Sequence, residues 1–258
     1  MTNTMQIDAN RRIIFALDIS DDLNAVASWV RRLKGYVGLF KIGKELFTKY
    51  GPPVVKLVQN EGCGVFLDLK YHDIPTTVAR ASEGAVGLGV AMFNLHALGG
   101  KEMMAQAIKA ASLKAEKEKK KRPTILAVTV LTSLNDRDLA ELGFTLPAAQ
   151  LVKKLAQLAK ESGIDGIICS PQEIAMVREV CGPDLLVVTP GVRRTNEVGK
   201  DDQKRTLTAR EAIAAGADYL VIGRPIREAE DPVLEAESLI EEIKAGLREK
   251  ELCRPFTG

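Results

Sequence analysis

Eight short apolar runs alternate with longer helical stretches along almost the whole chain of 258 residues. The predicted strands are residues 12–18, 37–43, 64–70, 90–96, 124–131, 166–170, 185–191 and 219–223. Between them, stretches such as 24–35, 76–89, 148–163 and 208–217 carry apolar residues three and four positions apart and often end in glycine, as helices do. Eight such repeats over about 250 residues predict an α/β fold of the (β/α)₈ TIM-barrel type.

The alternative to a closed barrel is a doubly wound open sheet, which has the same alternation of strands and helices. A dinucleotide-binding sheet would carry a glycine-rich turn after its first strand. This chain has ALDISDDLN there instead. No linker of disorder-like composition interrupts the pattern, so we expect one barrel domain over residues 1–258, with short tails at 1–10 and 250–258.

Charge and hydropathy exclude several kinds of partner. The net charge of +2 gives no general signal for nucleic acid, and no apolar run is long enough to span a bilayer. The most conspicuous charge run, KAEKEKKKRP at 114–123, is typical of a solvated last helical turn before proline. We therefore expect neither a nucleic-acid partner nor a membrane.

The cysteines and the N-terminus bear on location and on metals. Cys63, Cys169, Cys181 and Cys253 are scattered without a CxxC pair, and the two histidines cannot supply a zinc site alone. The opening residues lack the apolar core of a signal peptide. We expect a reduced cytoplasmic protein with free thiols and without a metal site.

Polar side chains collect at the predicted C-terminal ends of the strands, where TIM barrels hold their active sites. Each alone could be an ordinary polar residue at a strand end, but two aspartates and two lysines from three neighbouring strands suggest a site. These candidates are Asp18, Lys41, Asp68, Lys70, Thr132, Ser170 and Pro190. His96 also ends a strand, but a single histidine there is more often structural, so it is left out.

The third predicted strand runs into the segment FLDLKYHDIPTT at 66–77. Asp68 and Lys70 are two residues apart, so their side chains share one face of the strand, about 6.6 Å apart along it. Asp73 follows where the chain turns at Pro75. A lysine between carboxylates is expected to stay protonated, which favours a proton donor over a Schiff-base lysine. A purely structural ion-pair network is the alternative.

Glycine and arginine follow the last two predicted strands. Gly191 and Arg193 come after the seventh, and Gly223 and Arg224 after the eighth. The loops after strands seven and eight commonly bind phosphate in this fold, through exposed N–H groups and arginine. Ordinary turn glycines beside surface arginines are the alternative. The polar stretch 193–206 between them is either disordered or a lid over ligand.

Taken together, these motifs resemble the orotidine 5′-monophosphate decarboxylase family over nearly the whole chain. The segments that carry the resemblance are FALD (15–18), FKIG (40–43), FLDLKYHDIPTT (66–77), LTS (131–133), TPGVR (189–193), DDQKR (201–205) and VIGRPI (221–226). The core DxKxxD also occurs in hexulose-phosphate synthases and keto-gulonate-phosphate decarboxylases. Those relatives carry a metal-binding glutamate where this chain has Lys41, so Lys41 and Gln203 favour the nucleotide enzyme.

The resemblance implies conversion of orotidine monophosphate to uridine monophosphate in de novo pyrimidine synthesis, without metal or cofactor. It implies that Lys70 protonates C6 of the pyrimidine and that Asp68 holds Lys70. It further implies a homodimer, in which some side chains reach the neighbouring site. The remaining implied contacts are Asp18 and Lys41 with ribose, Asp73 and Thr77 across the dimer, Thr132 and Ser170 near the base, and Arg193, Gln203, Gly223 and Arg224 with phosphate.

Two other functions remain open from the sequence. One is a metal-dependent sugar-phosphate lyase or decarboxylase on the same barrel, against which Lys41 argues. The other is a non-catalytic phosphate-binding barrel, against which the intact Asp68, Lys70 and Asp73 set argues.

Overall fold

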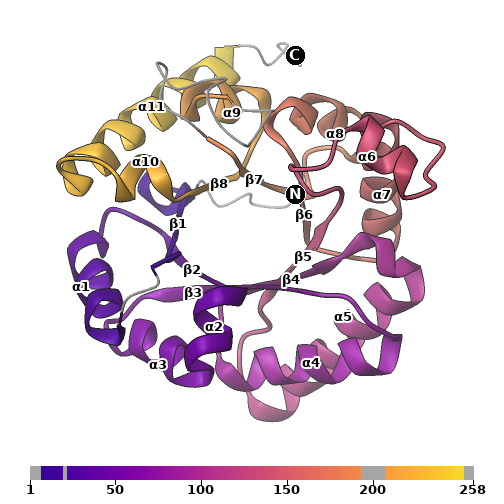
Figure 1. The fold of residues 1–258 in the computed structure, drawn as a ribbon, viewed down its shortest axis with the longest axis horizontal. Helices are drawn as coiled ribbons and strands as arrows, with labels where there is room; N and C mark the ends of the chain where they lie inside the picture. The colour runs from indigo at the N-terminus through magenta and orange to yellow at the C-terminus, as the bar shows by residue number, and fades with distance from the viewer. Residues whose placement is uncertain (1–6, 20–21, 193–206, 253–258) are drawn as a thin grey trace, which may run out of the picture.

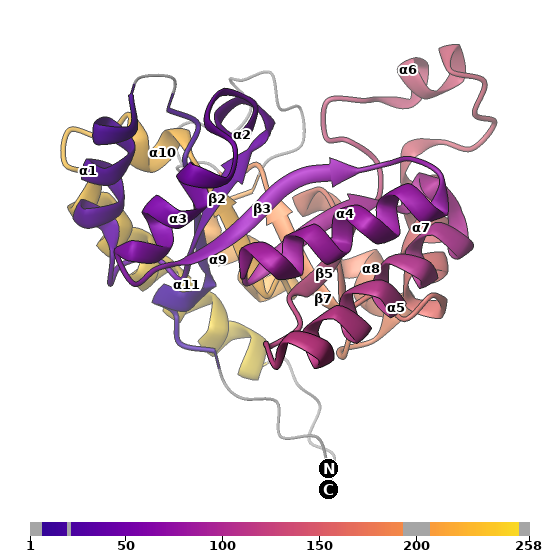
Figure 2. The same cartoon turned by 90° about the horizontal axis from the view of Figure 1, so that it is seen from below.

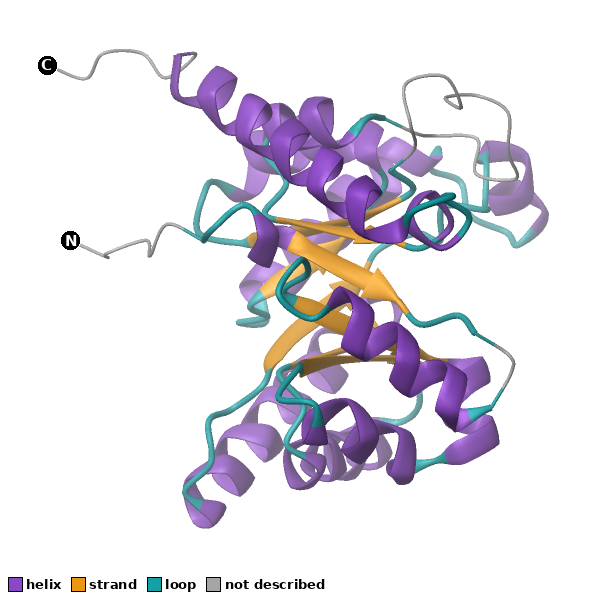
Figure 3. Cartoon of the chain, turned by 90° about the vertical axis from the view of Figure 1, so that its left-hand side faces the viewer, coloured by secondary structure: helices purple, strands orange, loops and turns teal. Residues whose placement is uncertain are grey.

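The computed structural model describes residues 7–19, 22–192 and 207–252. Eight parallel strands form a closed barrel in chain order, and helices surround it (Figures 1 and 3). The strands are β1 (Ile13–Ala16), β2 (Leu39–Gly43), β3 (Gly64–Tyr71), β4 (Met92–His96), β5 (Thr124–Val128), β6 (Gly166–Ile168), β7 (Leu186–Pro190) and β8 (Tyr219–Ile222). The predicted TIM barrel is confirmed, with strands that mostly end one to three residues inside the predicted bounds.

Closure distinguishes this barrel from the open-sheet alternative. β1 pairs in parallel with β8, and Ile14 is opposite Val221 in that register. The other seven neighbouring pairs are parallel as well. The sheet therefore has no edge among the described strands.

The helices fill the connections between strands. They are α1 (Leu23–Leu33), α2 (Lys44–Tyr50), α3 (Pro52–Asn60), α4 (Pro75–Leu88), α5 (Gly100–Glu118), α6 (Asp136–Glu141), α7 (Ala148–Glu161), α8 (Ile174–Cys181), α9 (Ala209–Ala215), α10 (Arg224–Arg227) and α11 (Pro232–Leu252), with 3₁₀ turns η1 (Asn10–Arg12), η2 (Ala97–Gly99) and η3 (Pro171–Glu173). α6 stands out from the ring of helices (Figure 2). No helix in the described ranges is long and apolar enough to cross a membrane.

Local sequence signals explain where several helices begin and end. The Asp22 side chain accepts a hydrogen bond from the Ala25 N–H at the start of α1. Pro75 occupies the first turn of α4, where the missing N–H costs no helical hydrogen bond. The charge run at 114–123 begins on the last turns of α5, as predicted, and α5 ends at Glu118.

Two apolar layers hold the barrel together. The interior is filled below its open end by Ile14, Phe66, Met92, Leu126 and Val188, all buried. A larger layer lies between the strands and the helices. Apolar side chains thus fill the middle of the barrel, and the polar candidates from the sequence lie above them, where the strands finish. Cys63, Cys169 and Cys181 are free thiols, and Cys253 lies outside the described residues.

Candidate active site

A cavity of about 470 Å³ opens at the C-terminal ends of the strands. Its wall comes from seven of the eight strands or from the residues that follow them, but not from β4. The lining residues are Ala16, Asp18, Lys41, Glu45, Phe66, Asp68, Lys70, Val128, Val130, Leu131, Thr132, Ile168, Cys169, Pro190, Gly191, Val221, Gly223, Arg224 and Arg227. Apolar groups therefore form much of one wall, and charged groups gather on another.

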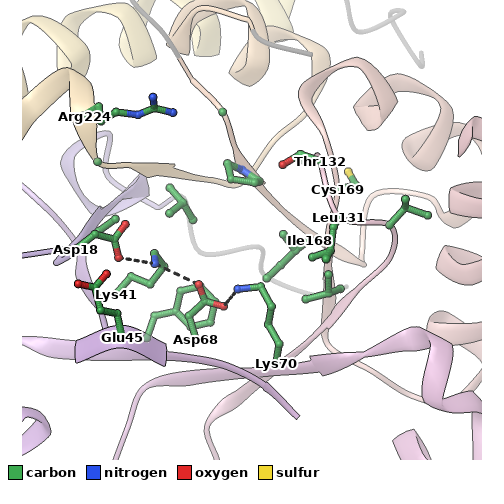
Figure 4. A pocket seen from close by; sticks show the side chains of 18 of the residues that line it. Asp18, Lys41, Glu45, Asp68, Lys70, Leu131, Thr132, Ile168, Cys169 and Arg224 are labelled. Atoms are coloured by element: carbon green, nitrogen blue, oxygen red, sulfur yellow. Dashed lines mark hydrogen bonds and ion pairs between the residues drawn. The ribbon is translucent and has the colours of Figure 1, made fainter. Parts of the chain in front are cut away.

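Four charged side chains form a continuous chain along this wall (Figure 4). Lys41 Nζ lies 3.2 Å from Asp18 Oδ1 and 3.2 Å from Asp68 Oδ2. Lys70 Nζ lies 2.6 Å from the other oxygen of that carboxylate, Asp68 Oδ1. The order Asp18–Lys41–Asp68–Lys70 alternates in sign, so each inner group has an opposite charge on both sides.

The inner pair of this chain is the most buried. The side chains of Lys41 and Asp68 are 11% and 10% exposed, whereas that of Lys70 is 27% exposed. Lys70 thus faces the cavity more openly than the groups that hold it. Burial of a charge is costly unless it is paired, and here each buried charge has two partners of opposite sign.

The pKa values of the buried pair reflect these neighbours. Burial alone would raise the pKa of Asp68, but the ammonium groups of Lys41 and Lys70, with hydrogen bonds from Lys70 and Asn94, lower it below its usual range. Burial alone would lower the pKa of Lys41, but Asp68 and Asp18 raise it. Both groups therefore stay ionised at neutral pH.

A third contact to the Asp68 carboxylate comes from β4. Asn94 Nδ2 donates to Asp68 Oδ1 over 2.7 Å, and Asn94 Oδ1 accepts from the Lys70 backbone N–H over 2.8 Å. The Asn94 side chain is fully buried. It lies behind the wall of the cavity rather than in it.

Glycine and arginine define another part of the cavity. Gly191 follows β7 with a φ of 83°, a conformation that favours glycine. Gly223 follows β8, and Arg224 begins α10. Arg227, three residues further along α10, also lines the cavity, and its Nη1 donates to the Asp18 backbone carbonyl over 2.8 Å.

The structure brings most of the predicted site residues together in this cavity. Asp18, Lys41, Asp68, Lys70, Thr132, Pro190, Gly223 and Arg224 all line it. Arg193 and Gln203 lie outside the described residues. The functional roles of these residues stay predictions.

Three predicted residues lie away from the cavity wall. Ser170 is fully buried where η3 begins, and its backbone N–H donates to the Glu173 carboxylate over 2.9 Å. Ile168 and Cys169 line the cavity in its place, because β6 ends at Ile168 and the chain turns away after Cys169. Asp73, beyond the end of β3, and Thr77, in the first turn of α4, are both exposed.

Sequence reasoning missed Asn94, Arg227 and Glu45. Arg227 had a usable signal, because residues three apart on a helix lie on the same side and Arg224 was already a candidate. Asn94 also had one, since a polar residue in a predicted strand next to Asp68 is unusual in a barrel interior. Glu45 follows β2 on α2, where its sequence context resembles any exposed first helical turn.

His96 lies at the end of β4, with its ring centroid 5.3 Å from that of His72. Burial, together with His72, Lys70 and Lys44, lowers the pKa of His96 to about 4, so its ring is neutral at pH 7. It does not line the cavity. Within the described residues, no group of three or more His, Cys, Asp and Glu side chains is arranged to hold a metal ion.

Comparisons with known proteins agree with one another. The model of the orotidine 5′-phosphate decarboxylase / HUMPS family matches residues 11–239. The chain is 54% identical over 248 residues to the orotidine 5′-phosphate decarboxylase of Syntrophus aciditrophicus, covering 96% of this chain and 99% of that protein. It is 51% identical over 238 residues to the enzyme of that name from Geobacter sulfurreducens, covering 92% and 98%.

A solved structure matches as well. The crystal structure of orotidine 5′-phosphate decarboxylase from Lactobacillus acidophilus superimposes with a TM-score of 0.80 at 36% sequence identity. The match covers 91% of this chain and all of that one.

Proposed function

The chain belongs to the orotidine 5′-phosphate decarboxylase / HUMPS family and is a decarboxylase of pyrimidine biosynthesis, and we propose that it converts orotidine 5′-phosphate to uridine 5′-phosphate without metal or cofactor. The observation that carries this proposal is the Asp18–Lys41–Asp68–Lys70 chain in the cavity wall. It presents an ammonium group, fixed by a buried carboxylate, to a space that can hold a nucleotide.

The chemistry requires such an ammonium. When the bond between C6 and the carboxylate breaks, CO₂ leaves and the electron pair stays on C6, with no adjacent carbonyl to accept it. A positive charge that is already in place stabilises this carbanion as it develops. Lys70 then gives its proton to C6 and regains one from solvent.

In this scheme Asp68 has a positioning role toward Lys70. Its Oδ1 accepts from Lys70 Nζ over 2.6 Å, which fixes the position of the ammonium. Lys41 balances the second carboxylate oxygen, at 3.2 Å. The Lys41 and Asp18 pair then remains to contact the ribose.

The part of the cavity beside α10 suits the phosphate. The backbone at Gly223 and the guanidinium of Arg224 supply an N–H donor and a positive charge. Arg193 and Gln203 keep the phosphate role that the family resemblance implies. Thr132, beside apolar Leu131, Ile168 and Val130, has the mixed surroundings that a pyrimidine ring needs.

We further propose a homodimer in the cytoplasm, with Asp73 and Thr77 contributed to the neighbouring subunit's site. Support comes from their exposure outside their own cavity. Ile74, next to Asp73, is 64% exposed, and Leu98, on the adjoining segment, is 42% exposed. Such apolar side chains suit an interface between two copies of the chain.

The decisive assay follows the absorbance of orotidine 5′-phosphate with protein that has been treated with EDTA and dialysed. We expect full activity, because no proposed step needs a metal. Loss of activity that magnesium restores would instead assign the chain to the metal-dependent sugar-phosphate branch of the same barrels. A protein that binds uridine monophosphate but never decarboxylates would be the non-catalytic alternative.

A further inference from the structure

Asn94 lies behind the cavity wall and touches both groups on which the proposed chemistry depends. Its Oδ1 accepts from the Lys70 backbone N–H at 2.8 Å, and its Nδ2 donates to Asp68 Oδ1 at 2.7 Å. The amide is fully buried. Asp68 Oδ1 thus accepts from Asn94 and from Lys70 Nζ, which leaves Oδ2 to Lys41.

The backbone around these contacts is irregular. β3 and β4 pair at Leu67 with Phe93 and again at Tyr71 with Leu95. Between these pairs β3 has Asp68, Leu69 and Lys70, where β4 has only Asn94. The hydrogen-bond ladder between β3 and β4 therefore cannot pair every backbone N–H and C=O group of β3. The Lys70 N–H donates to the Asn94 side chain instead of to a backbone carbonyl of β4.

Lys70 lies within this irregular stretch of β3. Lys70 has a φ of 52°, a conformation that residues with a side chain rarely adopt. Its backbone is held there while its side chain returns to within 2.6 Å of Asp68. A contact that fixes the Lys70 N–H thus helps to fix where the ammonium lies.

Simple packing does not account for an asparagine at this position. Met92, two residues earlier on β4, belongs to the apolar filling of the barrel. A buried amide is unfavourable there unless it is hydrogen-bonded, and both ends of this amide bond to proposed site residues.

We propose that Asn94 is a positioning residue for decarboxylation, which holds the bulge of β3 so that Asp68 and Lys70 meet at the cavity wall. The inference rests on the proposed function. Asn94 does not reach the substrate, and it acts through the two residues to which it bonds.

The test begins with wild-type turnover of orotidine 5′-phosphate. An inactive wild type would reject the proposed function itself. Given an active wild type, Asn94→Ala should lower kcat on the order of 100-fold, since small displacements of reacting groups are costly. KM and the Kd of uridine monophosphate should change less than about threefold, because substrate binding rests on other groups.

Thr129→Val is the matched control. Thr129 is fully buried just after β5, and its Oγ1 donates to the Ile168 carbonyl over 3.1 Å. Thr129 contacts neither Asp68 nor Lys70. Loss of its hydroxyl group should therefore lower the free energy of unfolding without lowering kcat more than about threefold. A kcat for Asn94→Ala within threefold of wild type, or no lower than that of the control, would overturn the positioning role.

The pH dependence of kcat in Asn94→Asp distinguishes a positioning role from a purely structural one. The new side chain can still accept from the Lys70 N–H, but when ionised it cannot donate to Asp68 and repels it. Its kcat relative to wild type should therefore rise as pH falls and the introduced carboxyl takes up a proton. If the ratio of variant kcat to wild-type kcat is low and stays constant from about pH 8 to 5, the inference is overturned. If Asn94→Ala does not fold, this nearly isosteric variant decides the matter.

Discussion

The Lys70 side chain faces the cavity, whereas its backbone has an uncommon conformation. In the described part of the chain only Lys70 and Lys119 are non-glycine residues with a positive φ, and Lys119 is the C-terminal cap that follows α5. The left-handed conformation costs such a residue about 1–2 kcal/mol. The contacts to Asn94 and Asp68 offset this cost, so the strain marks a residue whose position is fixed by its surroundings.

Replacing Lys70 by alanine should separate catalysis from folding. Lys70→Ala removes both the proton donor and the positive charge beside C6, so kcat should fall at least about 10⁴-fold. Uridine monophosphate should still bind, which calorimetry can measure. Lys44→Ala is the control, because Lys44 is an exposed lysine nearby on α2 that does not line the cavity. Near-normal turnover by Lys70→Ala would contradict the mechanism.

His96 should make the fold sensitive to acid. Its pKa is about 4 in the folded protein, against an ordinary value of 6.5, so the folded state favours the neutral ring. The stability that this provides is complete above about pH 6.5 and is lost as pH falls toward 4. Urea unfolding of wild type and His96→Gln at pH 7, 5.5 and 4.5 measures this contribution to stability. The free energy of unfolding should decline less with acid in the variant, and parallel declines would contradict the assignment.

Single residues show where sequence reasoning stops. Strand alternation predicted that Asp68 and Lys70 share a face, and their side chains do meet. It could not predict the bulge that brings them together, because position 70 carries no glycine to signal a left-handed residue. Asn94 stood out as a polar residue in a predicted strand, but its partners could not be predicted, since they depend on the register between β3 and β4.

At the scale of elements, strand ends decide which side chains reach the cavity. Apolar runs located all eight strands, because a run of buried residues is a property of the sequence itself. The ends were less predictable: residues 129–131 and 169–170 were expected in strands, yet β5 stops at Val128 and β6 at Ile168. Those shorter ends are why Cys169 lines the cavity and Ser170 does not.

The short helix α10 should carry much of the phosphate recognition. Arg224→Ala removes a charged contact worth about 1.5–3 kcal/mol, so kcat/KM for orotidine 5′-phosphate should fall about 10- to 150-fold. The loss on orotidine, which lacks the phosphate, should be far smaller. Arg137→Ala on α6, whose side chain is 86% exposed, is the control. Equal proportional losses on both substrates would show that Arg224 does not act through phosphate.

At the scale of the whole molecule, the closed topology could be predicted and the assembly could not. Eight strand–helix repeats in a chain of this length leave few arrangements other than a barrel. An interface depends on which exposed groups meet a second copy, and composition does not encode that. Only the family resemblance pointed to a dimer, and the exposed Asp73, Ile74 and Leu98 are the features of this chain that suit one.

If Asp73 serves the neighbouring site, two inactive proteins should restore each other. Each dimer then has two composite sites, each with Lys70 from one subunit and Asp73 from the other. When Lys70→Ala and Asp73→Asn subunits exchange, one site of the mixed dimer carries both defects and the other carries neither. Random exchange makes half of the dimers mixed, with one good site in two, so activity should return to roughly one quarter of wild type.

A second mixture controls for this result. Asp68 and Lys70 belong to the same cavity, so a mixed dimer of Asp68→Asn and Lys70→Ala has one defect in each site and should stay inactive. Exchange is verified in both mixtures by pulling down a tagged subunit with its untagged partner. If the Asp73→Asn mixture also stays inactive after verified exchange, Asp73 serves its own subunit, because only a residue that crosses the interface can separate the two defects.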